Sequence, residues 1–104
     1  MPFVERQHPR FPLQLPVSFS GNQEGTGIVK NLSLGGCQVE SQTEAYAGDY
    51  LSLKMQLTEG DSPLTVDAAA VRWSEGYTFG LSFDWLKPQE QDRLNRFLST
   101  LQVS

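Results

Sequence analysis

Hydrophobic and polar residues alternate with a period of two in several short stretches of the chain. This pattern predicts β-strands with one buried face, and we expect them at residues 13–19, 26–32, 37–41, 51–57, 64–73 and 77–85. Turn-forming residues separate the stretches, most clearly at 21–27, 48–49 and 59–63. The short link at 74–76 predicts a hairpin between the last two strands.

The stretch at 64–73 changes phase along its length. Val66 and Ala70 fall on one phase of the alternation, whereas Val71 and Trp73 fall on the other. Since a period-two pattern cannot change phase without an extra residue, we expect a bulge or a switch of face in this strand.

The pattern near the C-terminus has the period of a helix, which we expect over residues 87–102. Pro88 suits a first turn, and Glu90 and Asp92 place negative charge near the helix N-terminus. An apolar stripe runs along one face: Leu94, Phe97, Leu98 and Leu101. Six strands followed by one helix predict an all-β fold with a C-terminal helix, a closed or nearly closed six-stranded antiparallel β-barrel. The helix would cover an open end of the barrel or lie across its outside.

Length and composition fit one folded domain. We interpret residues 1–104 as a single unit with a flexible basic arm at 1–12, the barrel at 13–85 and the helix at 87–102. Hydrophobic residues make up 38% of the chain and charged residues 19%, values typical of a folded domain. The apolar runs are too short to span a membrane, and no secretory signal is visible. We therefore expect a cytoplasmic protein that is a monomer or a weak dimer.

The charge distribution limits the possible partners. The net charge is -4, and residues 31–92 carry ten acidic side chains against three basic ones. Because a nucleic-acid footprint needs clustered basic charge, we do not expect DNA or RNA as a partner. A small anion could still be held by two or three well-placed arginines.

Metal binding and catalysis are not expected. His8 and Cys37 are the single histidine and the single cysteine, so an internal disulfide or a zinc site cannot be assembled from them. Neither residue has an evident partner for nucleophilic or acid–base chemistry, and we interpret Cys37 as a packed core residue. The protein is therefore predicted to bind rather than to catalyse, without a cofactor.

Two short motifs carry the functional information. Arg6 and Arg10 are four residues apart in a segment where Pro9 disfavours a regular helix. A guanidinium can grip phosphate with two hydrogen bonds and can stack on a flat ring. Alternatively, both arginines are simply solvated charges.

The second motif contains Asn31, Ser33 and Gly36. Asn and Ser can hydrogen-bond a ligand or the neighbouring backbone, and a glycine permits the close approach of another group. The motif is therefore either part of a binding site or a capped turn between two strands.

In this order, and separated by one strand, the two motifs resemble those of the PilZ family of cyclic-di-GMP receptors. Arg6 and Arg10 match the arginine pair of the family. Asn31, Ser33 and Gly36 match its second element, with Asn in place of the commoner Asp. Residues 71–73 and 77–83 also look like its closing strands, so the resemblance covers about residues 4–101.

The resemblance implies a cyclic-di-GMP site on the outer surface of the barrel. Arg6 and Arg10 would engage phosphates and guanine, Asn31 and Ser33 would fix guanine or ribose-phosphate, and Gly36 would keep the approach free of a side chain. Trp73 would either flank the ligand or pack in the core. The implied ligand-binding set is Arg6, Arg10, Asn31, Ser33, Gly36 and Trp73.

Two functions remain open at this point. In the first, cyclic-di-GMP changes the conformation of the domain, which then signals to an unidentified downstream protein in motility, exopolysaccharide production or adhesion. In the second, the domain is a ligand-independent protein-interaction module. Glu5 precedes the arginine pair at a position where family members that bind two stacked ligands tend to have a basic residue. Because a carboxylate repels phosphate, we expect one ligand per site.

Overall fold

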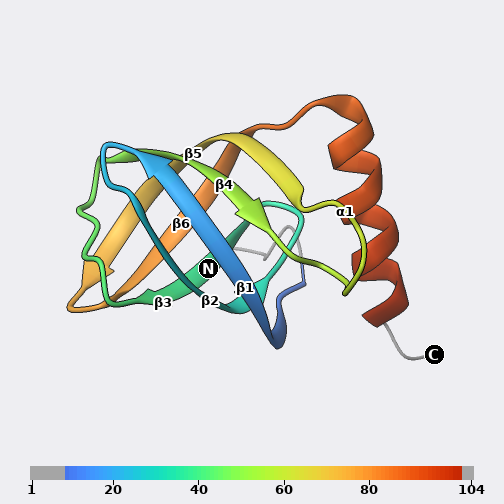
Figure 1. Cartoon of the computed structure of the whole chain (residues 1–104), viewed down its shortest axis with the longest axis horizontal. Coiled ribbons are helices and arrows are strands. Elements are labelled where there is room, and N and C mark those ends of the chain that lie inside the picture. Colours follow the sequence, from blue (N-terminus) through green and yellow to red (C-terminus); the bar gives the residue numbers. More distant parts are fainter. Residues whose placement is uncertain (1–8, 102–104) are drawn as a thin grey trace, which may run out of the picture.

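Six antiparallel strands close into a barrel, and one helix follows them (Figure 1). The structure is a computed structural model that describes residues 9–101. The elements are β1 (Phe11–Gly21), β2 (Gly25–Leu32), β3 (Gly36–Ser41), β4 (Tyr50–Met55), β5 (Leu64–Glu75), β6 (Thr78–Trp85) and α1 (Pro88–Leu101). Neighbouring strands around the barrel follow the order β1-β2-β3-β6-β5-β4, and β4 pairs with β1 to close it. The predicted fold class is confirmed.

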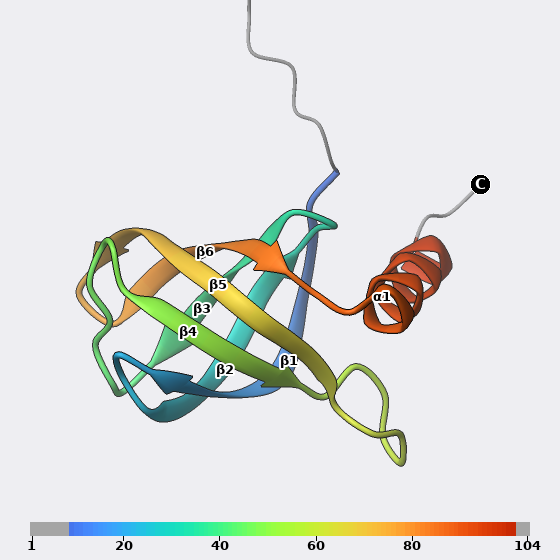
Figure 2. The same cartoon turned by 90° about the horizontal axis from the view of Figure 1, so that it is seen from above.

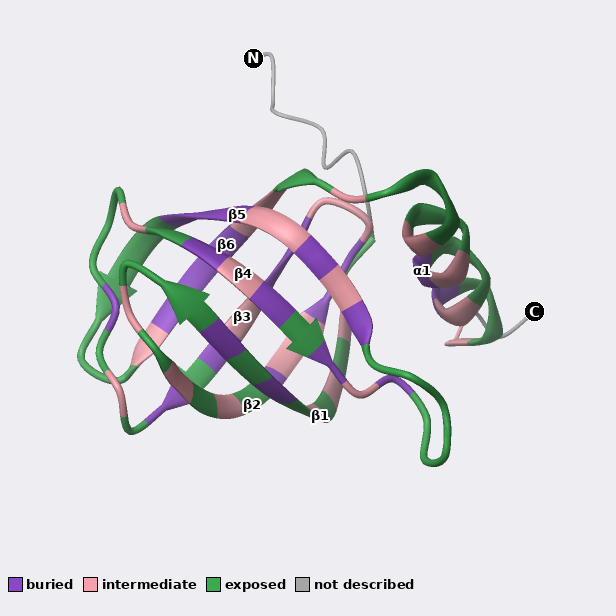
Figure 3. Ribbon diagram, turned by 45° about the horizontal axis from the view of Figure 1, so that its top comes forward, coloured by how far each residue is buried: buried purple, intermediate pink, exposed green. Residues whose placement is uncertain are grey.

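The barrel interior is filled by one face of each strand. Buried and less buried residues alternate over residues 64–67 at the start of β5 (Figure 3), as period-two patterning requires. Phe19 of β1 and Phe79 of β6 meet edge to face at the centre, with ring centroids 5.6 Å apart. Strand β1 begins two residues earlier than the pattern predicted, since Pro12 already pairs with Asn31 of β2. The predicted hairpin between β5 and β6 is confirmed, and Gly76 supplies the positive φ of 63° in its turn.

Within residues 9–101 the strand pairing shifts register at five places, and two of these bulges, in β5 and β2, shape the outer face of the barrel. In β5, Val71 pairs with Leu81 and Trp73 with Gly80, which leaves Arg72 as an extra residue. The phase change predicted for this strand is therefore confirmed. A second bulge, which the sequence did not indicate, lies in β2 between Val29 and Asn31.

Helix α1 lies beside one end of the barrel (Figure 2). Leu94 and Leu98 are buried in the core cluster, which places the apolar stripe against the barrel. The Glu90 carboxylate accepts a hydrogen bond of 2.7 Å from the backbone N–H of Thr65, at the start of β5. Among residues 9–101, no helix is both long and apolar enough to cross a bilayer.

Candidate functional site

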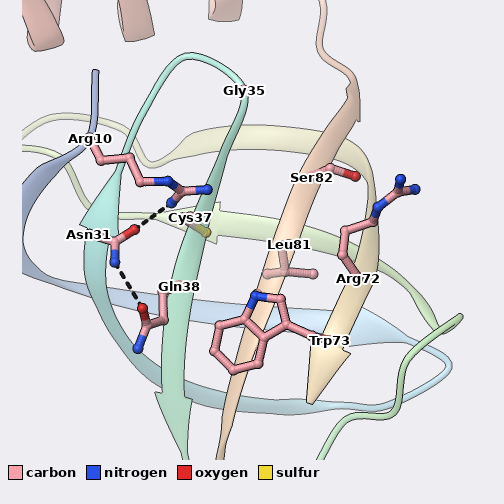
Figure 4. Close-up of a pocket in the computed structure, with 10 residues that line it drawn as sticks. Arg10, Asn31, Gly35, Cys37, Gln38, Arg72, Trp73, Leu81 and Ser82 are labelled. Carbon is pink, nitrogen blue, oxygen red and sulfur yellow. Dashed lines mark hydrogen bonds between the residues drawn. The ribbon is translucent and has the colours of Figure 1, made fainter. Parts of the chain in front are cut away.

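A pocket of about 390 Å³ lies on the outer face of the barrel across β2, β3, β6 and β5 (Figure 4). We call it the outer-face pocket. Its lining includes three of the six predicted ligand-binding residues, Arg10, Asn31 and Trp73. The full lining is Arg10, Asn31, Gly35, Cys37, Gln38, Arg72, Trp73, Gly80, Leu81 and Ser82.

The floor of the pocket is a row of directly paired residues. Asn31 of β2 pairs with Gln38 of β3, Gln38 with Gly80 of β6, and Gly80 with Trp73 of β5. Directly paired residues of neighbouring strands share one face of a sheet. The barrel therefore gathers on one surface residues that lie up to 49 positions apart in the chain.

A chain of hydrogen bonds runs from one wall of the pocket onto its floor. The Arg10 guanidinium donates to Asn31 Oδ1 at 2.7 Å, and Asn31 Nδ2 donates to Gln38 Oε1 at 2.9 Å (Figure 4). The first bond joins the two sequence motifs. It holds the arginine of the first motif against the strand that carries the second.

Trp73 lies on the outside of the barrel and not in its core. Its side chain is 43% exposed, and its indole covers the backbone of Gly80. A Cβ atom at position 80 would collide with the indole ring, so a glycine is needed for Trp73 to lie flat on β6. The result is a flat aromatic surface in the pocket, which suits stacking by a planar base.

The bulge in β5 brings Arg72 into the same pocket. Without an extra residue, consecutive residues of a strand point to opposite faces. The bulge adds Arg72 beside Trp73 in the exposed end of β5, and both residues line the pocket. Figure 4 shows the Arg72 guanidinium on the β5 side, across the pocket from Arg10.

Ser33 and Gly36 serve the turn between β2 and β3. Ser33 is buried, and its hydroxyl accepts hydrogen bonds of 3.2 Å from the N–H groups of Gly35 and Gly36. A Cβ atom on Gly36 would strike the carbonyl oxygen of Leu81 on β6. Both residues thus have a role in local packing and do not line the pocket, although the Gly35 between them does.

Cys37 lies beneath the pocket as a free thiol in the core cluster. Burial raises its pKa from 9.0 to about 12, partly opposed by the positive charge of Arg10. The thiol therefore stays protonated at neutral pH, in agreement with its interpretation as a packed residue.

The remaining candidates of the first motif, Arg6 and His8, lie outside the described residues, as does Glu5. Within the part of the chain that the structure describes, no cluster of three or more His, Cys, Asp or Glu side chains is arranged to hold a metal ion. The chemistry that the pocket offers is therefore a guanidinium on each side, side-chain amides on the floor and one indole face.

Comparison with known proteins agrees with this geometry. The profile of the PilZ domain family matches residues 5–100. The chain belongs to the PilZ domain family. No curated protein sequence gave a match.

Two solved structures share the PilZ fold with this domain. The inhibitor of motility MotI/DgrA from Bacillus subtilis is 22% identical with a TM-score of 0.75, over 95% of this chain and 52% of that chain. This PilZ domain thus spans about half the length of that protein. The PilZ domain of CeSA from a cellulose-synthesizing bacterium is 17% identical with a TM-score of 0.69, over 89% of this chain and 97% of that chain.

Seven of the ten residues that line the outer-face pocket were absent from the predicted site, and three of them shape its floor and its β5 wall: Gln38, Arg72 and Gly80. Gln38 and Gly80 face the pocket through strand register, which a single sequence does not reveal. Arg72 carried a usable signal, because it lies at the phase change of its strand. A bulge at a phase change can turn a charged side chain toward a binding site.

Proposed function

We propose that this PilZ domain is a cyclic-di-GMP receptor. It binds one ligand molecule in the outer-face pocket, changes conformation around Arg10, and so signals to a downstream protein. Family membership supports the ligand class, and the pocket supports the location.

One observation carries the proposal. Arg10 and Asn31 come from two motifs that are 21 positions apart, and a hydrogen bond of 2.7 Å joins them at a pocket that also contains the exposed Trp73. A guanidinium beside an aromatic face suits a ligand that combines phosphate with a planar base. Cyclic-di-GMP has both groups.

Ligand binding would exchange the partner of Arg10. In the structure its guanidinium donates to the neutral amide of Asn31. A phosphate carries a negative charge and can accept two parallel bonds from a guanidinium, whereas the amide oxygen of Asn31 is uncharged and accepts one. Arg10 would therefore turn from Asn31 to the phosphate, and the released Asn31 amide would bind guanine or ribose.

Movement of Arg10 would also change the surface that a partner protein meets. Arg10 directly precedes β1, so a new position of its side chain alters the chain entering the barrel at Phe11. Arg6 would supply further positive charge, a role that rests on the motif alone. A ligand can shift such an equilibrium only by binding the two states with different affinity.

Isothermal titration calorimetry with cyclic-di-GMP, GTP and GMP tests the assignment. We expect cyclic-di-GMP to bind most tightly with one molecule per chain, and Arg10→Ala to weaken it by about tenfold or more. Lys54→Ala is the matched control, because Lys54 is an exposed cation on β4 that does not line the outer-face pocket. A stoichiometry of two would contradict the single-ligand proposal.

The second candidate, a ligand-independent interaction module, is favoured by the partners that motif residues already have. Ser33 caps its turn, Gly36 packs against Leu81, and Arg10 bonds to Asn31. The motif could therefore be kept for the fold alone. Unchanged amide chemical shifts at Arg10, Phe11 and residues 31–38 under saturating cyclic-di-GMP would favour this module over the receptor.

A further inference from the structure

We infer that Arg72 binds the second phosphate of a cyclic dinucleotide, so that the outer-face pocket distinguishes ligands with two phosphodiesters from mononucleotides. This inference rests on the proposed function and assigns a role to a residue outside the two sequence motifs.

The bulge in β5 is the first support for a role of Arg72 in binding. Arg72 is the extra residue between the pairs Val71–Leu81 and Trp73–Gly80. Bulges re-aim side chains and are enriched next to functional sites. Here the bulge places a cation beside the indole surface, on the wall of the pocket opposite Arg10 (Figure 4).

The free donors of Arg72 are the second support. Among residues 9–101 its guanidinium makes no hydrogen bond or salt bridge, whereas Arg93 donates to Pro63, Ser62 and Glu90. Arg72 is also exposed, so it can turn toward a ligand without breaking an existing contact. An arginine with five unused donors can grip phosphate through two parallel bonds.

The separation of the two walls gives the specificity. The row from Asn31 to Trp73 crosses from β2 to β5, so three strand spacings of the curved barrel wall separate the strand beside Arg10 from the strand that carries Arg72. A mononucleotide phosphate bound at Arg10 therefore leaves Arg72 unused. A cyclic dinucleotide carries phosphates on opposite sides of its macrocycle, and it can offer one to each wall while a guanine lies on Trp73.

Affinity measurements on variants of the full chain test this inference. Dissociation constants for cyclic-di-GMP and for GMP are compared at one ionic strength for the wild type, Arg72→Ala, Arg72→Lys and the Lys54→Ala control. We expect Arg72→Ala to weaken cyclic-di-GMP by about tenfold or more and to leave GMP unchanged. Arg10→Ala should weaken both ligands, and Arg72→Lys should restore part of the affinity, since Lys keeps the charge without the planar fork.

The outcomes separate this inference from the proposed function. If the wild type binds cyclic-di-GMP and Arg72→Ala binds it equally well, the role of Arg72 is refuted and the receptor function stands. An equal loss for GMP would also refute it, because Arg72 would then not recognise the second phosphate. If the wild type does not bind, both proposals fail. Should the variants unfold, an unchanged Arg72 Nε–Hε resonance in the ligand-saturated wild type would refute the inference.

Discussion

Two hollows on this domain contain arginines, and they use them differently. The outer-face pocket contains Arg10, which donates to one neutral amide, and Arg72, which has no protein partner among the described residues. The second hollow, of about 300 Å³, lies between α1 and the loop at residues 56–63. There Arg93 donates to the carbonyls of Pro63 and Ser62, at 3.2 and 2.5 Å, and pairs with Glu90 at 3.3 Å.

The difference shows that an arginine at a hollow does not by itself mark an anion site. The guanidinium of Arg93 donates to backbone carbonyls within the fold and so links the loop at 56–63 to the helix. Arg96 also lines that hollow and has no hydrogen bond or salt bridge within residues 9–101, but Asp61 lies there too and would repel an anion. Arg10 and Arg72 keep donors for a phosphate. We therefore expect the helix side to govern stability and the outer-face pocket to govern binding.

The largest effect that separates the two regions is expected from Leu94→Ala. Leu94 is fully buried where α1 meets the barrel, and truncation of such a side chain costs about 2–5 kcal/mol of unfolding free energy. Urea denaturation measures the loss, and cyclic-di-GMP affinity below the transition should be unchanged. Asn95→Ala, on the exposed side of the helix, is the control. A Leu94→Ala domain that is folded but binds cyclic-di-GMP much more weakly would contradict the expectation that the helix side governs stability alone.

Gly80→Ala is expected to act mainly on the pocket. The new Cβ would displace the Trp73 indole from β6, and the loss of stacking on a base costs about 1–3 kcal/mol of binding free energy. In a Trp85→Phe background Trp73 is the single tryptophan, and its fluorescence reports both its environment and the ligand. Thr78→Ala, on the same strand but outside the pocket lining, should behave as the wild type. Unchanged emission and affinity in Gly80→Ala would contradict the stacking surface.

Arg93→Ala should lower stability and leave binding intact. Its hydrogen bonds to Ser62 and Pro63 involve a charged donor, and bonds of this kind contribute about 1.5–3 kcal/mol. Arg96→Ala is the comparison in the same hollow, because Arg96 has no hydrogen bond or salt bridge within residues 9–101. Chemical denaturation should show a clear loss for Arg93→Ala alone. Equal losses of unfolding free energy in the two variants would mean that the Arg93 hydrogen bonds to Ser62 and Pro63 do not stabilise the domain.

The smallest effect concerns the thiol beneath the outer-face pocket and appears only in alkali. Burial raises the pKa of Cys37 from 9.0 to about 12. Above pH 9 the unfolded chain releases this proton before the folded one, so stability is lost as the pH rises toward 12. At pH 10 this pKa difference lowers the free energy of unfolding by about 1.4 kcal/mol. Urea titrations at pH 7.5 and 10 should show that the wild type loses more unfolding free energy between the two pH values than Cys37→Ala does. Equal losses would indicate that water reaches the Cys37 thiol in the folded domain.

Local sequence patterns predicted most of the fold. Each of the six alternating stretches corresponds to a strand, because one face of every strand fills the barrel interior. The phase change near Val71 correctly indicated a bulge. The bulge in β2 went unpredicted, since Lys30 and Asn31 are both polar and the pattern shows no break there.

The site was only partly accessible from sequence. Arg10, Asn31 and Trp73 were predicted and do line one pocket. Gln38 and Gly80 join them through pairing between β3 and β6, strands separated by 36 residues of intervening chain. Such register depends on long-range contacts and not on any local signal.

The acceptor that restrains Arg10 is an amide and not a carboxylate. An amide neither gains nor loses a proton between mildly acidic and mildly alkaline pH, so this acceptor is the same throughout that range. The exchange of Arg10 from Asn31 to a phosphate should accordingly depend on ionic strength and ligand concentration, and mild acidification alone should not release this contact.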